Sequence, residues 1–265
     1  MVVRELRALW RYREFLLGSI RKDIALRFKG SLFGMAWLII PPIFMIGMYT
    51  IVFSSVMKAR LPGVAGEFGY SLYLCAGIVL WSFFADSVQR MSMVFIENAN
   101  LIKKSSFPIL SLPLIVIGSG TFNFLVTLLV LAGLLFITGN WPGSAWVGMI
   151  PIVLLLMTLT GFLGLFIAIF NVFFRDVGQF IGMFLQLAFW CTPIVYPAET
   201  LPPWARELLS FNPLAHLVHA SQSIIVYGKF PDFSQWLCPL SWMLVLGGFA
   251  LLSYQKLRGY MLDEL

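Results

Sequence analysis

Long apolar runs without charge alternate along the chain with shorter segments that hold the charged residues. A helix needs about 20 mostly apolar residues to cross a membrane, because the hydrocarbon core is about 30 Å thick and each residue rises about 1.5 Å. Six runs meet this length, and they predict an all-α integral membrane protein. The predicted transmembrane helices lie at about 32–57, 70–90, 113–138, 146–170, 179–197 and 236–254.

Two proline-containing segments modify this pattern. The uncharged stretch 208–228 is rich in polar residues, so we do not count it as a span. Polar or irregular backbone is tolerated at membrane depth only where protein or a wet cavity covers it, so this stretch is expected to be re-entrant or interfacial. Two short helices, hinged near Pro202-Pro203 and Pro213, would account for this part of the chain. Pro41-Pro42 is expected to kink the first span, either for packing or beside a path.

The distribution of Lys and Arg sets the orientation. With the N-terminus inside, only Lys58, Arg60, Arg206 and Lys229 of the 18 basic residues fall in outer segments. Cytoplasmic flanks carry the excess of Lys and Arg. Both termini are therefore predicted to be cytoplasmic, which requires an even number of spans.

Composition agrees with a membrane protein. The 265 residues are 60% hydrophobic and 11% charged, against roughly 45–50% and about 25% in soluble domains. The run 105–174 holds no Asp, Glu, Lys or Arg, whereas the first 29 residues are densely charged, unlike a secretory signal. The three cysteines have no CxxC spacing and are interpreted as small buried hydrophobes.

Residues 1–30 are predicted to form an amphipathic interfacial segment, ahead of a six-helix domain over 31–265. Charged residues recur on one helical face and apolar residues such as Leu16, Ile20 and Ile24 on the other. The helix is either a membrane-surface anchor or a mobile gate or docking helix.

The connection 97–108 between the second and third spans is predicted to face the cytoplasm. It is short, of mixed polarity and closed by a proline, and it would present Leu101, Ile102 and Phe107. Three large apolar residues in such a turn favour a protein partner, with lipid headgroups as the alternative cover.

Catalytic chemistry is sparse. The sequence has no G-x-x-x-x-G-K-[ST] phosphate loop, no nucleophile constellation and no metal-ligand spacing around His216 and His219. Asp86 is the one clear ionisable residue within a span, and Arg90 at i+4 predicts a local ion pair. We therefore predict no catalytic residue, no metal and no cofactor bound by this chain, and we expect no nucleic-acid partner.

Aromatic residues gather in the second and fifth predicted spans. Rings there either line a conduit and stack on sugar faces or pack towards lipid. The candidates for lining a channel are Trp81, Phe83, Phe84, Phe189, Trp190 and Tyr196.

Several motifs, taken in order, resemble the permease subunits of bacterial type-2 ATP-binding-cassette exporters, among them those that export capsular polysaccharide or O-antigen chains. The motifs are Arg21–Ser31 followed by Gly34, Trp37 and Pro41, then Asn98–Pro108, Asn171–Val177, Thr192–Pro197 and Asn212–Leu214. After Asn212–Leu214, several relatives place a basic residue where this chain has Ser221-Gln222-Ser223.

The resemblance implies a homodimer in the bacterial inner membrane that encloses a channel for a lipid-linked glycan. Two separate cytoplasmic ATPase subunits would bind the ATP and Mg. It implies that residues of the 97–108 connection couple to the ATPase, namely Asn98, Leu101, Ile102, Lys103, Lys104, Phe107 and Pro108. It implies a cytoplasmic gate at Arg21, Arg27 and Lys29. It also implies a re-entrant periplasmic cap that includes Pro197, Pro202, Trp204, Asn212 and Pro213.

Three alternatives remain open at the level of sequence. The same architecture exports drugs, haem or lipids, and a carbohydrate-binding domain on the partner ATPase would separate that case. A membrane-embedded enzyme acting on lipid-linked sugars would need polar catalytic groups at an interface. A purely structural or assembly subunit would have no conduit.

Overall fold

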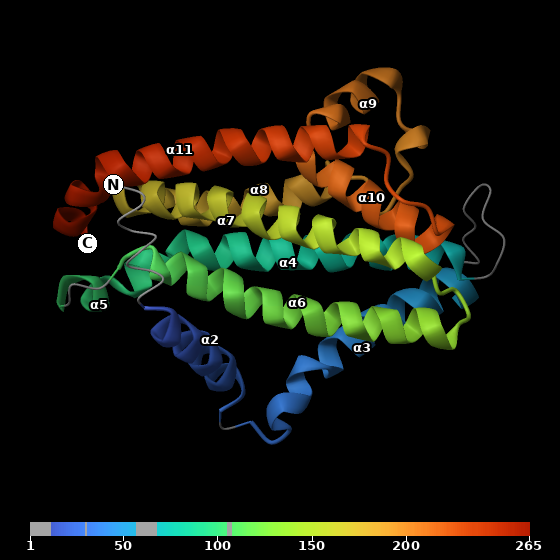
Figure 1. The fold of residues 1–265 in the computed structure, drawn as a ribbon, viewed down its shortest axis with the longest axis horizontal. Helices are drawn as coiled ribbons and strands as arrows, with labels where there is room; N and C mark the ends of the chain where they lie inside the picture. Colours follow the sequence, from blue (N-terminus) through green and yellow to red (C-terminus); the bar gives the residue numbers. More distant parts are fainter. Residues whose placement is uncertain (1–11, 30, 57–67, 105–107) are drawn as a thin grey trace.

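The computed structural model describes residues 12–29, 31–56, 68–104 and 108–265, and within these ranges every regular element is helical. The long helices are α4 (Gly69–Glu97), α6 (Ser111–Ile137), α7 (Met149–Phe173) and α11 (Ser234–Glu264). The shorter ones are α2 (Arg13–Phe28), α3 (Ile40–Thr50), α5 (Ala99–Lys104), α8 (Asp176–Trp190), α9 (Pro203–Ser210) and α10 (Pro213–Tyr227). The long helices lie side by side, with α2, α5 and the C-terminal end of α11 near one end of the bundle (Figure 1).

Five helical segments in the described part of the chain are long and apolar enough to cross a membrane. They are Ala36–Ser54, Gly69–Glu97, Ser111–Ile137, Gly143–Phe173 and Ser234–Met261. Each overlaps one predicted span. The predicted span at 179–197 is the exception, because α8 has only 15 residues and ends at Trp190. At 1.5 Å per residue α8 is about 22 Å long, shorter than a hydrocarbon core of about 30 Å.

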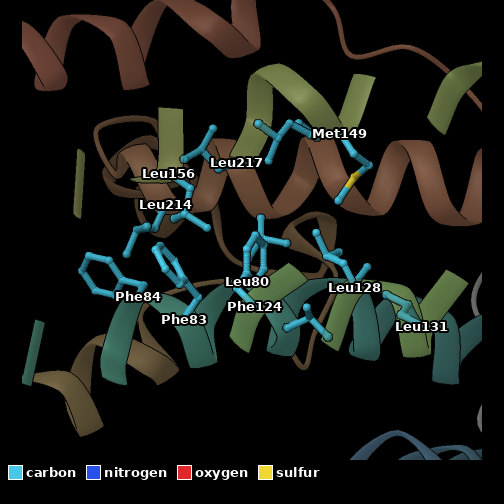
Figure 2. Close-up of a cluster of buried hydrophobic side chains, with 14 of the residues drawn as sticks. Leu80, Phe83, Phe84, Phe124, Leu128, Leu131, Met149, Leu156, Leu214 and Leu217 are labelled. Atoms are coloured by element: carbon cyan, nitrogen blue, oxygen red, sulfur yellow. The ribbon is translucent and has the colours of Figure 1, made fainter. Parts of the chain in front are cut away.

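Helix α4 forms the centre of the bundle. Its most apolar window is 83% buried, against 17% for α11 and 22% for Ala36–Ser54. Close contacts at small residues allow this packing: a Cβ at Gly164 of α7 would lie 2.5 Å from Met91 Sδ of α4. Leu80, Phe83 and Phe84 of α4 pack among side chains of α6, α7 and α10 (Figure 2). The outer faces of α3 and α11 are therefore left for lipid or another protein.

The predicted hinges in the segment before α11 are confirmed. Helix α9 begins at Pro203 and α10 at Pro213, where the missing N–H groups cost nothing in a first turn. Asn212 caps α10 by accepting a hydrogen bond from the Leu214 N–H at 3.0 Å. Gly228, with φ +61°, ends α10 in the left-handed conformation.

The two prolines of the first span do not lie inside a continuous α-helix. Residues Gly34–Leu38 form a separate 3₁₀ turn, and Pro41 and Pro42 lie in the first turn of α3. Proline there removes no hydrogen bond that a helix would otherwise make, so the pair starts a helix rather than bending one.

Candidate functional site

Helix α5, the described part of the 97–108 connection, follows α4 near one end of the bundle. Helix α4 ends at Glu97, Asn98 Nδ2 donates to the carbonyl oxygen of Val94 at 2.8 Å, and α5 follows directly. Leu101 is 43% exposed and Lys103 is exposed, whereas Ile102 is only 4% exposed and packs in the core with Ile109. The prediction that Ile102 is presented to a partner is therefore wrong, because α5 turns that side chain inward.

The structure describes the remaining predicted coupling residues, Pro108, Phe107 and Lys104, to different extents. Pro108 is buried, and its carbonyl oxygen accepts the N–H of Ser111 at 2.8 Å, which starts α6. Phe107 lies outside the described residues, and Lys104 is described only through its place at the end of α5.

Helix α2 packs against α6 through a close contact. A Cβ at Gly118 of α6 would lie 2.5 Å from Ile20 Cδ1, so glycine lets α2 approach. Of the predicted gate residues, Arg21 and Lys29 are exposed, and Arg27 lies 3.7 Å from Asp23 Oδ2. Leu16, Ile20 and Ile24 of the predicted apolar face are partly buried, whereas Leu17 of the same face is exposed.

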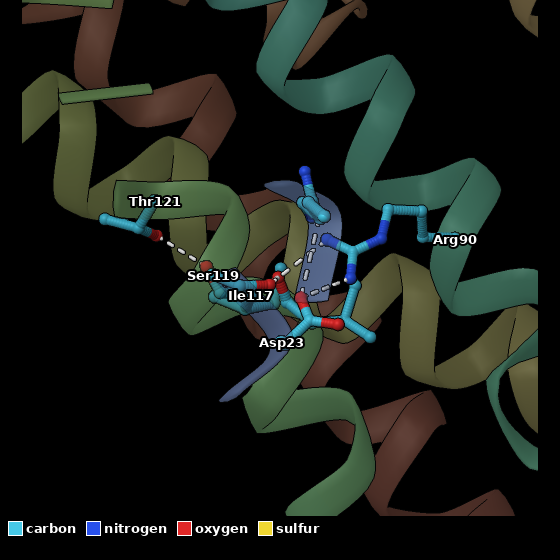
Figure 3. A network of polar contacts seen from close by, with 7 residues as sticks. Asp23, Arg90, Ile117, Ser119 and Thr121 are labelled. Carbon is cyan, nitrogen blue, oxygen red and sulfur yellow. Dashed lines mark hydrogen bonds and ion pairs between the residues drawn. The ribbon is translucent and has the colours of Figure 1, made fainter. Parts of the chain in front are cut away.

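An ion pair joins α2 to α4. Arg90 Nη2 lies 2.8 Å from Asp23 Oδ2, and Arg90 Nη1 donates to Ser119 Oγ of α6 at 3.1 Å. Figure 3 shows the guanidinium between these two oxygens. The predicted Asp86–Arg90 pair is wrong, because the Arg90 side chain points to α2 and α6 while Asp86 is exposed on α4. A single cation thus links three helices.

A cleft of about 940 Å³ lies between α2, α4 and α6. Its lining includes Lys22 and Asp23 from α2, Gln89 and Arg90 from α4, and Leu101 from α5. The cleft therefore connects the predicted gate helix with the predicted coupling segment, two parts that sequence reasoning treated separately.

The six candidate aromatic residues do not share one environment. Phe83 and Phe84 are buried, and Phe83 packs on Phe124 with ring centroids 5.0 Å apart, which contradicts their predicted place on a channel wall. Trp81 and Phe189 meet edge to face at 5.6 Å. Trp190 is 64% exposed, and its carbonyl oxygen accepts the hydroxyl of Tyr196.

Sequence reasoning missed a polar face beside these rings. Ser82, Asp86 and Gln89 are exposed at i, i+4 and i+7 on α4, and Gln179 and Gln186 are exposed on α8. A Cβ at Gly182 of α8 would lie 3.6 Å from Gln89 Oε1, so the two helices are neighbours here. The i, i+4, i+7 spacing of Ser82, Asp86 and Gln89 could have indicated this polar face from the sequence.

The predicted cap residues flank α9. None of the residues of α9 is buried, and Trp204 is exposed. Asn212 Nδ2 reaches the Cys191 carbonyl oxygen and Thr192 Oγ1, each at 3.3 Å, which ties the start of α10 to the end of α8. Pro197 is half-buried, Pro202 precedes α9 and Pro213 begins α10.

The Ser221-Gln222-Ser223 segment serves packing in this chain. Ser221 and Gln222 are buried, and Gln222 Nε2 donates to the carbonyl oxygens of Tyr73 at 3.4 Å and Pro193 at 3.3 Å. Within the described ranges, no group of three His, Cys, Asp or Glu side chains is arranged to hold a metal ion.

Most of this chain is similar in sequence to known proteins. A sequence model of the ABC-2 type transporter family matches residues 14–226, from α2 into α10. An O-antigen export system permease protein RfbA of Klebsiella pneumoniae is 30% identical over 247 residues, which are 92% of this chain and 93% of that protein. The protein of the same name from Myxococcus xanthus is 29% identical over 235 residues, 87% of each chain.

Proposed function

This chain belongs to the ABC-2 type transporter family, and on that premise we propose that it is the channel-forming membrane subunit of an ATP-driven exporter of a lipid-linked, O-antigen-type polysaccharide. Relatives that match it over about nine tenths of both chains carry the O-antigen export name, which supports this cargo. ATP and Mg would bind to two separate cytoplasmic ATPase subunits, since the sequence has no phosphate loop of its own.

The observation that carries the proposal is the ion pair between Asp23 and Arg90. It attaches the gate helix α2 to α4, whose end continues into α5. Arg90 precedes Glu97, the last residue of α4, by about two helical turns. A force that an ATPase subunit exerts on exposed Leu101 and Lys103 would therefore move α4 and carry α2 with it.

The polar face of α4 and α8 is the proposed wall of the export path. An ionisable side chain within a membrane-spanning helix is costly unless it faces water, a polar ligand or protein, so Asp86 and Gln89 indicate a polar path. Sugar hydroxyls can donate to Asp86 and to the glutamine carbonyls, and exposed Trp190 offers a ring for stacking. Many weak, equivalent contacts suit a polymer that must bind and release repeatedly.

A second copy of the chain would close this path, as a homodimer. Exposed apolar side chains remain on α3, such as Phe44, and on α8, such as Phe180 and Leu187.

The bundle end with α2 and α5 would face the cytoplasm, following the excess of Lys and Arg. In the inner membrane, α8 and the turn that follows it would form the sixth crossing, with α9 and α10 as the re-entrant periplasmic hairpin. Residues 1–30 would act as a unit distinct from 31–265.

The coupling assignment is tested by Leu101→Asp in the complex with the cytoplasmic ATPase partner. We expect loss of ATPase binding and of surface polysaccharide, with the permease still folded because Leu101 is partly exposed. Val147→Asp is the matched control, since Val147 is also exposed but lies near the opposite end of the bundle, before α7. Normal ATPase binding by Leu101→Asp would refute docking through α5.

A further inference from the structure

An apolar groove of about 980 Å³ runs between α2 and α6, separate from the cleft that holds Asp23. Its walls include Leu17 and Ile24 of α2 and Phe122 and Leu125 of α6, and its floor includes Gly118. Leu17, Phe122 and Leu125 are exposed in the described chain, so the groove is open to an apolar occupant.

Three cations join the lining of this groove, Arg21, Lys22 and Lys29. None of the residues that line it is acidic. Arg27, the other described cation near the end of α2, is instead paired with Asp23 on the cleft side. The groove therefore combines hydrocarbon-like walls with a concentrated positive charge that no acid in the lining neutralises.

We propose that this groove binds one anionic glycerophospholipid, with an acyl chain against α6 and the phosphate among Arg21, Lys22 and Lys29. Basic pockets between membrane helices on the cytoplasmic side suit anionic headgroups. The segment that follows α2 fits the same depth, because Leu32, Phe33 and Trp37 are all exposed and would enter a bilayer interface.

Such a lipid would hold α2 from the side opposite the cleft. Ile20 contacts Gly118 at the bottom of the groove, and Lys22 lines both the groove and the cleft. The ion pair to Arg90 and the lipid would then brace α2 on its two sides, so that membrane composition sets how firmly the gate helix is held.

Native mass spectrometry of the purified full chain tests this proposal with phosphatidylglycerol and, as the neutral lipid, phosphatidylethanolamine. The triple variant Arg21→Gln, Lys22→Gln, Lys29→Gln is expected to bind phosphatidylglycerol at least about tenfold more weakly, since each cation near an anionic lipid contributes about 1 kcal/mol. The matched triple variant Arg206→Gln, Lys229→Gln, Lys256→Gln removes the same charge from exposed positions elsewhere and is expected to bind normally.

A second variant tests the apolar half of the site. Ala25→Trp, at an exposed position in the groove lining, adds bulk without changing charge and is expected to weaken phosphatidylglycerol binding. Equal weakening in both triple variants would mean general surface attraction and overturn the proposal. Full displacement of the lipid by glycerol phosphate, or retention of polyprenyl phosphate in place of phosphatidylglycerol, would also overturn it. The measurement needs no export activity, so it stands apart from the proposed function.

Discussion

Removing the charge of Asp23 should loosen helix α2 from the bundle without unfolding the rest of the chain. The perturbation is Asp23→Asn, which keeps the side-chain size but ends the ion pair with Arg90 at 2.8 Å and the longer one with Arg27 at 3.7 Å. Helix α2 would then be held mainly by Ile20 and its apolar neighbours on α6.

The magnitude follows from the exposure of the pair. Hydrogen bonds to charged groups contribute about 1.5–3 kcal/mol, whereas fully exposed ion pairs contribute about 0–1 kcal/mol. The side chains of Arg90 and Asp23 are 25% and 33% exposed, which places them between these cases. We expect a coupling free energy of about 1.5 kcal/mol, or about tenfold in the equilibrium between docked and undocked α2.

Hydrogen exchange in lipid nanodiscs, read on the amides of Arg13–Phe28, is the assay. Asp23→Asn and Arg90→Gln should each speed exchange across α2, and the double variant should be little faster than either. Glu14→Gln is the matched control, because Glu14 is an exposed carboxylate on the same helix. Additive effects of the two single variants would show that the pair contributes nothing to docking, and would refute the route from α5 to α2.

Three further changes test other parts of the molecule. Gly164→Val should destabilise the bundle by about 1–3 kcal/mol in thermal unfolding, since the added side chain would press on fully buried Met91, whose Cβ lies 3.0 Å from the place of a new Cβ. Asn212→Ala should cost about 0.5–2 kcal/mol and speed hydrogen exchange at the start of α10, because Leu214 loses its cap; unchanged exchange would contradict the capping role. Asp86→Lys should lower surface polysaccharide while ATPase binding persists, and normal export would remove this residue from the path.

The sequence predicted the elements whose signal is local. Apolar runs located α4, α6, α7 and α11, and the prolines located the starts of α9 and α10. The end of α8 was missed because the apolar run continues past Trp190, although the backbone there turns at Thr192-Pro193. The hydropathy of a residue indicates whether it favours lipid or water as its surroundings. It does not indicate where the helical hydrogen bonds end.

Local sequence patterns could not predict the contacts of the candidate site. Asp23 and Arg90 are 67 residues apart, so only the packing of α2 on α4 and α6 brings them together. The i, i+4 rule favoured Asp86 as the partner of Arg90, but such surface pairs are worth only about 0.2–0.5 kcal/mol and yield to a tertiary partner. Ile102 was misplaced for a related reason, since the rotation of a six-residue helix depends on what it packs against.

The exposed faces of two neighbouring helices differ in a way that bears on the proposed export path. On α6 the exposed side chains include Leu125, Leu129 and Phe136, which suit hydrocarbon. Helix α4 is so largely buried that its few exposed positions are informative, and they include Asp86 and Gln89. A bilayer would penalise these polar groups, whereas hydrated sugar would not. Polar residues left exposed on an otherwise buried helix therefore support the proposed path more strongly than aromatic residues do, because aromatic residues suit both surfaces.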